Sequence, residues 1–239
     1  ISGDVTDEAD NCSTGLEATY SDAIDNSDPC NIIITRTWSL TDNCGNAAED
    51  QLQLIIVIDN TPPVFTRPPD TEIYTDPACG YDSSITETGD VLDEYDNCST
   101  GLEATYSDVI DDSDPCNIII SRTWSLEDFC GNEAADQVQT ILIRDLTAPF
   151  ITCPPNTAIT YGSSSDPLVT GYAVALDDCD DDPSISFSDD TIPGECYGNF
   201  EILRRWTATD QCGNIDSCDQ SIFVQDIEPP VITCMVTGN

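Results

Sequence analysis

A run of thirteen residues, DNCSTGLEATYSD, occurs at positions 10–22 and again, unchanged, at positions 96–108. So long an internal copy constrains the fold, because both copies must form the same structural unit. Trp38 recurs as Trp124, and a third, diverged copy places Trp206 at the corresponding point. The sequence therefore predicts a tandem-repeat protein, in which the repeated unit of architecture matters more than any single active site.

Three proline-containing linkers divide the chain, beginning at Asp59, Asp145 and Asp226. Proline fixes the backbone and cannot donate to a β-ladder, so these segments suit short, stiff connections. We predict a first repeat over residues 1–60 that lacks its opening strand or strands, a second over 61–146 and a third over 147–228. Residues 229–239 would open a next repeat or act as a donated strand.

Within each repeat the apolar residues alternate with polar ones. In the run from Ile32 to Leu40 one parity is mostly apolar, whereas the other carries Thr35, Thr37 and Ser39. A period of two is typical of a half-buried strand, and helical spacing is not sustained anywhere. Repeats of ~80–90 residues with several short strands and turn-rich gaps predict all-β sandwiches.

The charge balance is extreme, with 46 acidic residues, six arginines, no lysine and no histidine. Nucleic acid and anionic membranes require a basic surface, so neither is an expected partner. No apolar run has the ~20 residues of a membrane span. Nucleophilic catalysis normally needs a base such as histidine or lysine, so we expect no enzyme. The acidic surface either attracts divalent counter-ions or only aids solubility.

Thirteen cysteines without CxxC or Cys/His clusters indicate an oxidising compartment rather than zinc sites. Cys153 and Cys218 are present together in the third repeat and missing together in the second, where we align them with Arg67 and Asp136. Joint loss is the behaviour of a bonded pair, because a single survivor would be a free thiol. We predict the bond Cys153–Cys218, joining the first strand of that repeat to its last.

The third repeat contains Ile-Thr-Cys-Pro-Pro at 151–155, Asp-Asp-Cys at 177–179 and Arg-Trp-Thr-Ala-Thr-Asp-Gln-Cys-Gly-Asn at 205–214. This series resembles the hyalin repeat and, more closely, the hyalin-like repeats of very large surface proteins from Bacteroidetes-type bacteria. The resemblance covers nearly the whole chain. It implies tandem immunoglobulin-like sandwiches, an extracellular, cell-surface location and a role in adhesion or surface structure.

In an immunoglobulin-like sandwich the Asp-x-Cys and Cys-Gly-Asn loops would lie at the same end. That placement implies a disulfide between these loops in each repeat, with Cys79 and Cys116 as a further pair. The predicted bonds are Cys12–Cys44, Cys98–Cys130, Cys179–Cys212 and Cys79–Cys116. Cys30, Cys196 and Cys234 have no predicted partner.

The same end of each sandwich would face the linker from the preceding repeat, so acidic clusters should converge there. Calcium takes six to eight oxygen ligands, and carboxylates and amides supply them. The first linker also looks like the calcium-binding linkers of cadherins. The alternative is that Asp and Asn merely suit turns. The predicted calcium ligands are Asp59, Asn60, Asp96, Asn97, Asp128 and Asn132 at the first junction, and Asp145, Asp178, Asp180, Asp210 and Asn214 at the second.

Two smaller features also carry predictions. Arg36, Arg122 and Arg204 each precede the repeated tryptophan by two residues, and we expect intra-domain ion pairs or stacked guanidinium groups there rather than ligand binding. Asp190-Thr-Ile192 resembles the signal for O-glycans in Bacteroidetes-type bacteria, which makes Thr191 a candidate glycosylation site.

The function predicted from these features is a structural subunit or segment of an extracellular fibre. Nine residues precede Asp10, whereas 35 residues, 61–95, precede Asp96 in the second repeat. Residues 229–239 have the sequence of an opening strand, so copies of the chain could join head to tail through this segment and the first repeat. A single long polypeptide is the other possibility. An adhesin module binding surface glycans or proteins is the alternative function, with Tyr161, Tyr172 and Tyr197 as its only suggestive set.

Overall fold

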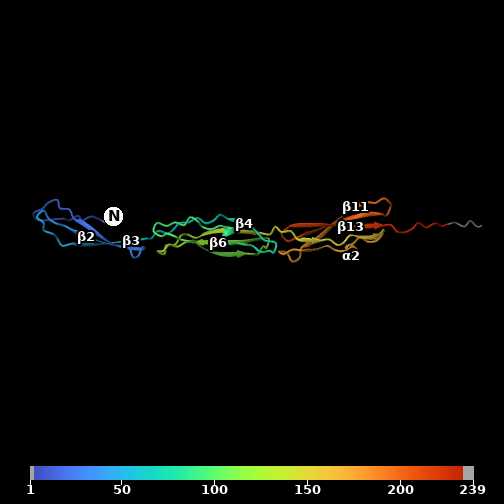
Figure 1. Cartoon of the computed structure of the whole chain (residues 1–239), viewed down its shortest axis with the longest axis horizontal. Helices are drawn as coiled ribbons and strands as arrows, with labels where there is room; N and C mark the ends of the chain where they lie inside the picture. Colours follow the sequence, from blue (N-terminus) through green and yellow to red (C-terminus); the bar gives the residue numbers. More distant parts are fainter. Residues whose placement is uncertain (1–2, 234–239) are drawn as a thin grey trace, which may run out of the picture. The chain divides into compact units, whose positions relative to one another are not determined.

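The computed structural model describes residues 3–233, and within that range the chain is all-β apart from two one-turn helices (Figure 1). The first repeat forms one antiparallel sheet in the order β1-β2-β3. Its strands are β1 (Thr19–Asp25), β2 (Asn31–Ser39) and β3 (Gln51–Ile58). The alternating run predicted as a strand thus corresponds to β2.

The second repeat forms a four-stranded sheet in the order β4-β7-β6-β5, in which β4 and β7 run parallel. Its opening segment crosses to the other side of the sandwich, where Val64 forms a bridge with Tyr95. The elements of this repeat are β4 (Thr71–Tyr74), α1 (Ile85–Thr88), β5 (Thr105–Asp111), β6 (Asn117–Ser125) and β7 (Gln137–Arg144).

The third repeat has the same arrangement of strands, with a longer hairpin between β11 and β12 than the one between β5 and β6. A two-stranded sheet, β10-β8, accompanies a four-stranded sheet in the order β11-β12-β13-β9, with β9 parallel to β13. The elements are β8 (Phe150–Thr152), β9 (Thr157–Thr160), α2 (Pro167–Thr170), β10 (Val174–Leu176), β11 (Ser184–Pro193), β12 (Phe200–Thr209) and β13 (Ile215–Gln225). The sequence expectation of tandem immunoglobulin-like β-sandwiches is confirmed.

The chain forms two compact units, and the boundary between them crosses the strands of the second repeat. Unit 1 comprises residues 1–69, 89–108 and 121–139, and unit 2 comprises 70–88, 109–120 and 140–239. Each unit therefore contains one of the two linkers that join consecutive repeats, together with the residues around it.

A buried tryptophan and glutamine organise the core of the second and third repeats. In the second repeat Trp124 donates its indole N–H to Oε1 of Gln139 at 3.2 Å, and the amide of Gln139 donates to the carbonyl of Pro69 at 2.9 Å. Trp206 and Gln220 form the same pair in the third repeat. Buried polar groups need partners of this kind, and here they also hold the turn that follows the opening strand.

The opening strand is fastened to the last strand in two different ways, by hydrogen bonds of Gln137 in the second repeat and by a disulfide in the third. In the third repeat the Cys153–Cys218 disulfide is present, as predicted. Cys218 pairs with Trp206, just as Gln51 pairs with Trp38 in the first repeat. The equivalents of Cys218 are therefore Gln51 in the first repeat and Gln137 in the second. The sequence alignment of Cys218 with Asp136 is wrong.

The repeated arginine lies inside each repeat, as expected. Arg204 makes two hydrogen bonds to Asp189, of 2.7 and 2.8 Å, and its guanidinium group lies 4.2 Å from the ring centroid of Phe187. Arg36 with Asp22, and Arg122 with Asp108, repeat this arrangement over a tyrosine ring. Each arginine thus fixes the central hairpin of its own sandwich.

The first repeat is less covered than the others. Among the described residues, no strand pairs with the outer edge of β3, whereas β7 and β13 each have a parallel neighbour there. Val57 is consequently 47% exposed, whereas Ile143, its counterpart in the second repeat, is 1% exposed. The first sandwich therefore retains apolar surface that the other two bury.

Candidate metal centres and disulfides at the repeat junctions

Three disulfides connect consecutive repeats, and two of them join equivalent positions. Cys30, in the hairpin between β1 and β2, is bonded to Cys130 in the Cys-Gly-Asn turn of the second repeat. Cys116, in the hairpin between β5 and β6, is bonded to Cys212 in the Cys-Gly-Asn turn of the third. The same bond therefore closes both junctions, and each lies within one compact unit.

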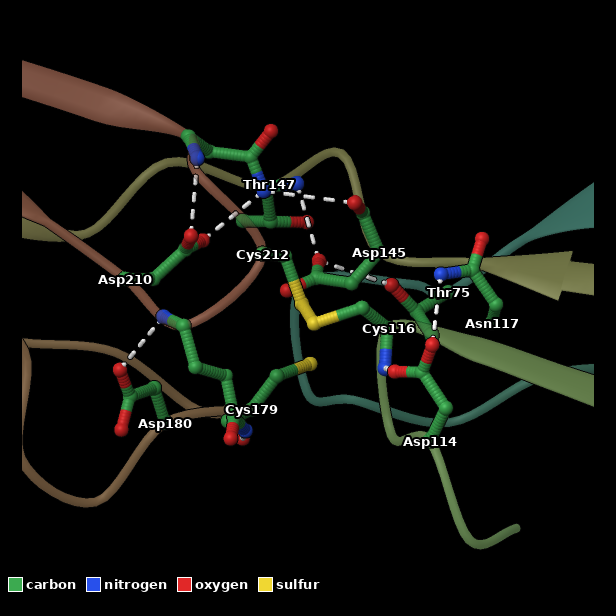
Figure 2. The surroundings of a disulfide bond; sticks show 12 residues. Thr75, Asp114, Cys116, Asn117, Asp145, Thr147, Cys179, Asp180, Asp210 and Cys212 are labelled. Atoms are coloured by element: carbon green, nitrogen blue, oxygen red, sulfur yellow. Dashed lines mark hydrogen bonds between the residues drawn. A yellow bond between two sulfur atoms is a disulfide. The ribbon is translucent and has the colours of Figure 1, made fainter.

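Aspartates hold these hairpin cysteines in place. Asp28 accepts a hydrogen bond from the backbone N–H of Cys30, and Asp114 accepts one from that of Cys116, both at 3.0 Å. Asparagine side chains donate to the second oxygen of each carboxylate, as Asn117 does to Asp114 in Figure 2. These hydrogen bonds hold the hairpin loop in addition to the disulfide.

Four of the five predicted disulfides are wrong. Cys79 is bonded to Cys179 of the next repeat, and Cys116 and Cys130 are also bonded to cysteines of neighbouring repeats. The predicted pairs Cys79–Cys116, Cys98–Cys130 and Cys179–Cys212 therefore do not form. Cys12 and Cys44, the fourth pair, are both free and exposed in the structure. The loop-end argument identified the correct end of each sandwich, but the bond runs across the junction to the hairpin of the preceding repeat.

Asp145 is the central residue of the second junction (Figure 2). It is 4% exposed, and its Oδ1 accepts hydrogen bonds from the backbone N–H of Thr147 at 2.9 Å and the hydroxyl of Thr75 at 3.1 Å. Among the described residues, its buried Oδ2 has no hydrogen-bond partner. A buried carboxylate oxygen without a partner is costly, and a cation is the natural compensation.

A second unpaired oxygen lies beside it. Asp177 accepts hydrogen bonds at Oδ1 from the backbone N–H groups of Cys179 and Asp180, and its buried Oδ2 has no hydrogen-bond partner in the described chain. Ligand atoms of Asp145, Asp177 and Cys179 lie within 4.8 Å of one another. Because Cys179 is in a disulfide, the two carboxylates are the available ligands.

Asp210 and Asn214 complete the second junction. The backbone and side-chain N–H groups of Asn214 donate to the two oxygens of Asp210, both at 2.8 Å. The same side chain also donates to the carbonyl of Asp145 at 3.3 Å. This asparagine therefore ties the Cys-Gly-Asn turn to the linker, and its contribution is positional.

The first junction has a related set of carboxylates. Asp59 and Asp96 each have one buried oxygen without a hydrogen-bond partner among the described residues. The other oxygen of Asp96 accepts from the backbone N–H groups of Cys98 and Ser99 at 2.7 Å. Ligand atoms of Asp59, Asp128 and Cys130 lie within 4.8 Å of one another. At each junction, one linker aspartate and one aspartate of the Asp-x-Cys loop thus have an unpaired carboxylate oxygen.

Charge and burial perturb two titrating groups at the first junction. Burial raises the pKa of the Cys98 thiol, and the negative charges of Asp59 and Asp96 raise it further. Burial, the largest single influence, raises the pKa of Asp128, but the hydrogen bonds from Asn132, Cys130 and Gly131 together leave this pKa lowered. The Cys98 thiol therefore has little thiolate character.

The structure brings together most of the predicted calcium ligands. Asp59, Asp96 and Asp128 meet at the first junction, and Asp145 lies at the second beside the Asp210–Asn214 turn. Asn60, Asn97 and Asp178 are exposed, and Asp180 instead accepts a 2.8 Å hydrogen bond from the backbone N–H of Gln211. Sequence reasoning missed Asp177, although aligning Asp96-Asn-Cys98 with Asp177-Asp-Cys179 would have found it.

The fold and these junctions define a class of protein. Four disulfides require an oxidising compartment, and the chain is an extracellular protein of tandem immunoglobulin-like sandwiches held together by disulfides. Within residues 3–233, no helix has the length and apolarity needed to cross a membrane.

Sequence comparison finds two mammalian relatives and no matching protein-family profile. The Sushi, von Willebrand factor type A, EGF and pentraxin domain-containing protein 1 of Mus musculus is 33% identical over 98 residues, covering 40% of this chain and 3% of that protein. The protein of the same name from Rattus norvegicus is 36% identical over 98 residues, with the same coverage. The bacterial source suggested by the hyalin-like motifs is unsupported by these relatives.

Structural comparison gives weak likenesses to cadherin-type ectodomains. The ectodomain of human desmocollin-1 has a TM-score of 0.30 and 11% identity, covering 96% of this chain and 58% of that one. Drosophila N-cadherin EC1–4 has a TM-score of 0.25 and 14% identity, covering 93% of this chain and 69% of that one. Likenesses of this size support no conclusion about function.

Proposed function

We propose that this chain is a non-enzymatic structural subunit or segment of an extracellular, cell-surface fibre. The observation that carries the proposal is the disulfide between hairpin and Cys-Gly-Asn turn, which closes both junctions of the described chain. A chain of independent domains would keep its disulfides within domains. Bonds across the junctions instead resist separation of one repeat from the next, which suits a load-bearing fibre.

Calcium stiffens each junction in this proposal. The buried, unpaired oxygens of Asp59 and Asp96 would bind one ion, and those of Asp145 and Asp177 a second. Backbone carbonyls and water would complete six to eight ligands, as extracellular calcium sites allow. Occupancy would remove the cost of two buried carboxylates at each junction and reduce repulsion in a chain of net charge −40.

Scattering and calorimetry together test this proposal. With 1–5 mM calcium, the unfolding temperature should rise, and small-angle scattering should report a narrower distribution of molecular dimensions than with chelator. The paired variant Asp59→Asn with Asp145→Asn should lose both responses while keeping its disulfides. Identical melting curves and scattering profiles with calcium and with chelator would contradict calcium binding.

Strand donation is the proposed means of assembly. A groove in the first repeat is lined by Ala9, Trp38, Leu40 and Gln51, among others. The corresponding place in the second repeat holds Phe65, whose backbone carbonyl accepts a 2.7 Å hydrogen bond from Gln137. Val231 and Ile232, which align with Val64 and Phe65, are 90% and 88% exposed. Residues 229–239 of one copy would therefore occupy the groove of another; positions 234–239 lie outside the described residues.

Electron microscopy of the purified chain tests strand donation directly. The intact chain should form filaments, and the chain without residues 229–239 should remain monomeric. A matched control replaces Ile232 by Asp, which keeps the chain length but puts a charge where an apolar side chain must be buried. Filaments of unchanged geometry from both variants would refute donation.

A glycan-binding adhesin is the second candidate function, and one surface hollow favours it. Tyr161 and Tyr197 line this hollow, with ring centroids 6.0 Å apart and Tyr197 90% exposed. Tyr172 does not join them and lies against Trp206 instead. Thr191 lines the same hollow, so a glycan attached there would obstruct a ligand. Binding to a glycan array that is lost in Tyr197→Ala would establish this function. An intact mass equal to that of the unmodified sequence would exclude a glycan on Thr191.

A further inference from the structure

Two exposed cysteines correspond in position to the two halves of the junction disulfide. Cys196 lies in the hairpin between β11 and β12, as Cys30 and Cys116 lie in the hairpins of the earlier repeats. Cys44 lies in the Cys-Gly-Asn turn of the first repeat, as Cys130 and Cys212 do in theirs. Both Cys44 and Cys196 are free and exposed, whereas the corresponding cysteines within the chain are bonded.

The turn around Cys44 already has the shape of the bonded turns. Asp42 accepts hydrogen bonds from the backbone N–H of Cys44 at 2.9 Å and from the backbone and side-chain N–H groups of Asn46 at 2.7 Å. Around Cys130, Asp128 accepts the same three hydrogen bonds, each at 2.8 Å. Cys44 therefore occupies a preformed partner site rather than a disordered loop.

The hairpin around Cys196 is longer but ends at the same side of its repeat. Cys196 precedes Trp206 by ten residues, whereas Cys116 precedes Trp124 by eight. Backbone hydrogen bonds from Gly194 to Asn199 and from Asn199 to Cys196 close this loop. Asn199 also accepts a 2.7 Å hydrogen bond from the N–H of Asp226, so the hairpin lies against the start of the third linker.

The carboxylates that form a junction are also present here, some beside Cys196 at the third linker and the others beside Cys44 in the first repeat. Asp226 accepts a hydrogen bond from the N–H two residues ahead at 3.0 Å, as Asp59 and Asp145 do in their linkers. At the other end, Asp10 accepts from the N–H groups of Cys12 and Ser13 at 2.8 Å, in the manner of Asp96. Asp10 is exposed, whereas Asp96 is 7% exposed in its completed junction.

We propose that Cys196 of one copy forms a disulfide with Cys44 of a second copy, which closes a third junction between them. This inference rests on the proposed fibre function and deepens it, because the partner is a second copy of this chain and the joint is covalent. Asp226 of the first copy then meets Asp10 and Asp42 of the second, which reproduces the carboxylate set of the internal junctions.

The bond forms by thiol–disulfide exchange with a small-molecule disulfide such as oxidised glutathione. The thiolate of one cysteine attacks the oxidant, giving a mixed disulfide and releasing one glutathione thiol. The thiolate of the other cysteine attacks the protein sulfur of that mixed disulfide and releases the second glutathione. Two protein thiols are oxidised to one disulfide, and one glutathione disulfide is reduced to two thiols.

The test uses a mixture of two preparations of the full chain, one of natural isotopic composition and one labelled with ¹⁵N. After incubation in glutathione redox buffer, the mixture is alkylated, digested without reductant and analysed by mass spectrometry. The expected product is a peptide pair containing Cys44 of one preparation and Cys196 of the other. Non-reducing gels should show a ladder of multimers that collapses on reduction.

Single substitutions separate the disulfide from the fibre. Cys196→Ser and Cys44→Ser should each lower the amount of disulfide-linked multimer at least tenfold. Cys98→Ser, a matched control at another exposed cysteine, should leave that amount unchanged. If filaments form but dissociate to monomers in non-reducing detergent, strand donation stands and the disulfide is overturned. A Cys12–Cys44 bond within one chain, or a linked pair that never mixes isotopes, overturns it as well.

Discussion

Gln137 donates a 2.7 Å hydrogen bond from its side-chain amide to the backbone carbonyl of Phe65. The amide oxygen of the same residue accepts a 3.2 Å hydrogen bond from the backbone N–H of Arg67. One glutamine therefore fastens the opening strand of the second repeat to its last strand, at the position where the third repeat has the Cys153–Cys218 disulfide. A non-covalent clasp and a covalent bond perform the same task in neighbouring copies.

This clasp predicts that Gln137→Ala destabilises the chain. Two partly buried backbone groups would lose these hydrogen bonds, and the free energy of unfolding should fall by about 1–3 kcal/mol. Gln51→Ala is the matched control, since the side-chain amide of Gln51 donates only a 3.3 Å hydrogen bond to the carbonyl of Glu49. Guanidinium denaturation of the monomeric chain measures both. Equal losses in the two variants would contradict the clasp.

The four disulfides predict a specific peptide map. Digestion without reductant should yield linked peptides for Cys30–Cys130, Cys116–Cys212, Cys79–Cys179 and Cys153–Cys218. Replacing Cys30 and Cys130 together by serine removes a closed loop with a sequence separation of 100 residues, worth about 4–5 kcal/mol on the loop-entropy model. A fall in unfolding temperature is therefore expected, and Cys98→Ser should cause none. Recovery of Cys98–Cys130 in the wild-type map would show that the junction bond is wrong.

Asp145→Asn should act in opposite directions with and without calcium. Without the ion, the substitution removes a buried charge whose Oδ2 lacks a hydrogen-bond partner, so the unfolding temperature should rise. With millimolar calcium the variant should melt below the wild type, because it has lost a ligand. Asp178→Asn is the control, since Asp178 is exposed beside the same loop. Parallel shifts in both conditions would indicate a purely structural role for Asp145.

Arg204 and Arg205 offer a matched pair for the ion pair inside the third repeat. Arg204 is 1% exposed and bonded twice to Asp189, whereas Arg205 is exposed and donates to Ser217 at 2.8 Å. Arg204→Ala should cost roughly 3 kcal/mol, near the lower end for a broken buried pair, because Asp189 keeps partial contact with water. Arg205→Ala should change stability by less than about 0.5 kcal/mol. Thermal unfolding distinguishes the two, and similar melting points would argue against a buried role for Arg204.

Acid should destabilise the first repeat through Asp22 and Asp42. Hydrogen bonds from Arg36 lower the pKa of Asp22, and those from Asn46 lower the pKa of Asp42. A depressed folded-state pKa gives stability that is present above the unfolded value, about 4, and is lost as the pH falls through the folded value. Chemical denaturation at a series of pH values should therefore report a loss of stability below about pH 4. In Asp22→Asn this loss of stability should be smaller. If stability falls with pH as steeply as in the wild type, Asp22 does not contribute.

The sequence was informative where one copy could be read on its own. Alternation from Ile32 to Trp38 predicted β2, and the arginine two residues before each tryptophan predicted an internal ion pair. The disulfides failed for a physical reason. Every Cys-Gly-Asn turn is equivalent, so a bond from Cys130 to Cys98 in its own repeat and one to Cys30 in the preceding repeat have the same sequence signature. Only the folded junction, where the turn meets the preceding hairpin, distinguishes them.

The metal ligands were predictable to the extent that they follow local loop geometry. Asp59 and Asp145 begin equivalent linkers, and Asp96 stands at the same point of its loop as Asp177. Choosing Asp178 in place of Asp177 put the predicted ligand on the outside of the loop. Which of two adjacent aspartates faces inward depends on the turn closed by the N–H groups of Cys179 and Asp180, and the sequence does not reveal that turn.

The two disulfides between hairpin and Cys-Gly-Asn turn also determine how tension would travel along the chain. Load entering at Cys30 passes directly to Cys130, returns along β6 to Cys116, and leaves through Cys212. The shortest covalent path between Cys30 and Cys212 is thus little more than one strand, on the order of 50 Å when fully stretched, instead of several hundred ångströms for the intervening polypeptide. A β-strand already rises ~3.3 Å per residue, so this path has almost no slack. Under tension, loss of the folded structure between these cysteines would add almost no length, and the segment would behave as an inextensible tether rather than a spring.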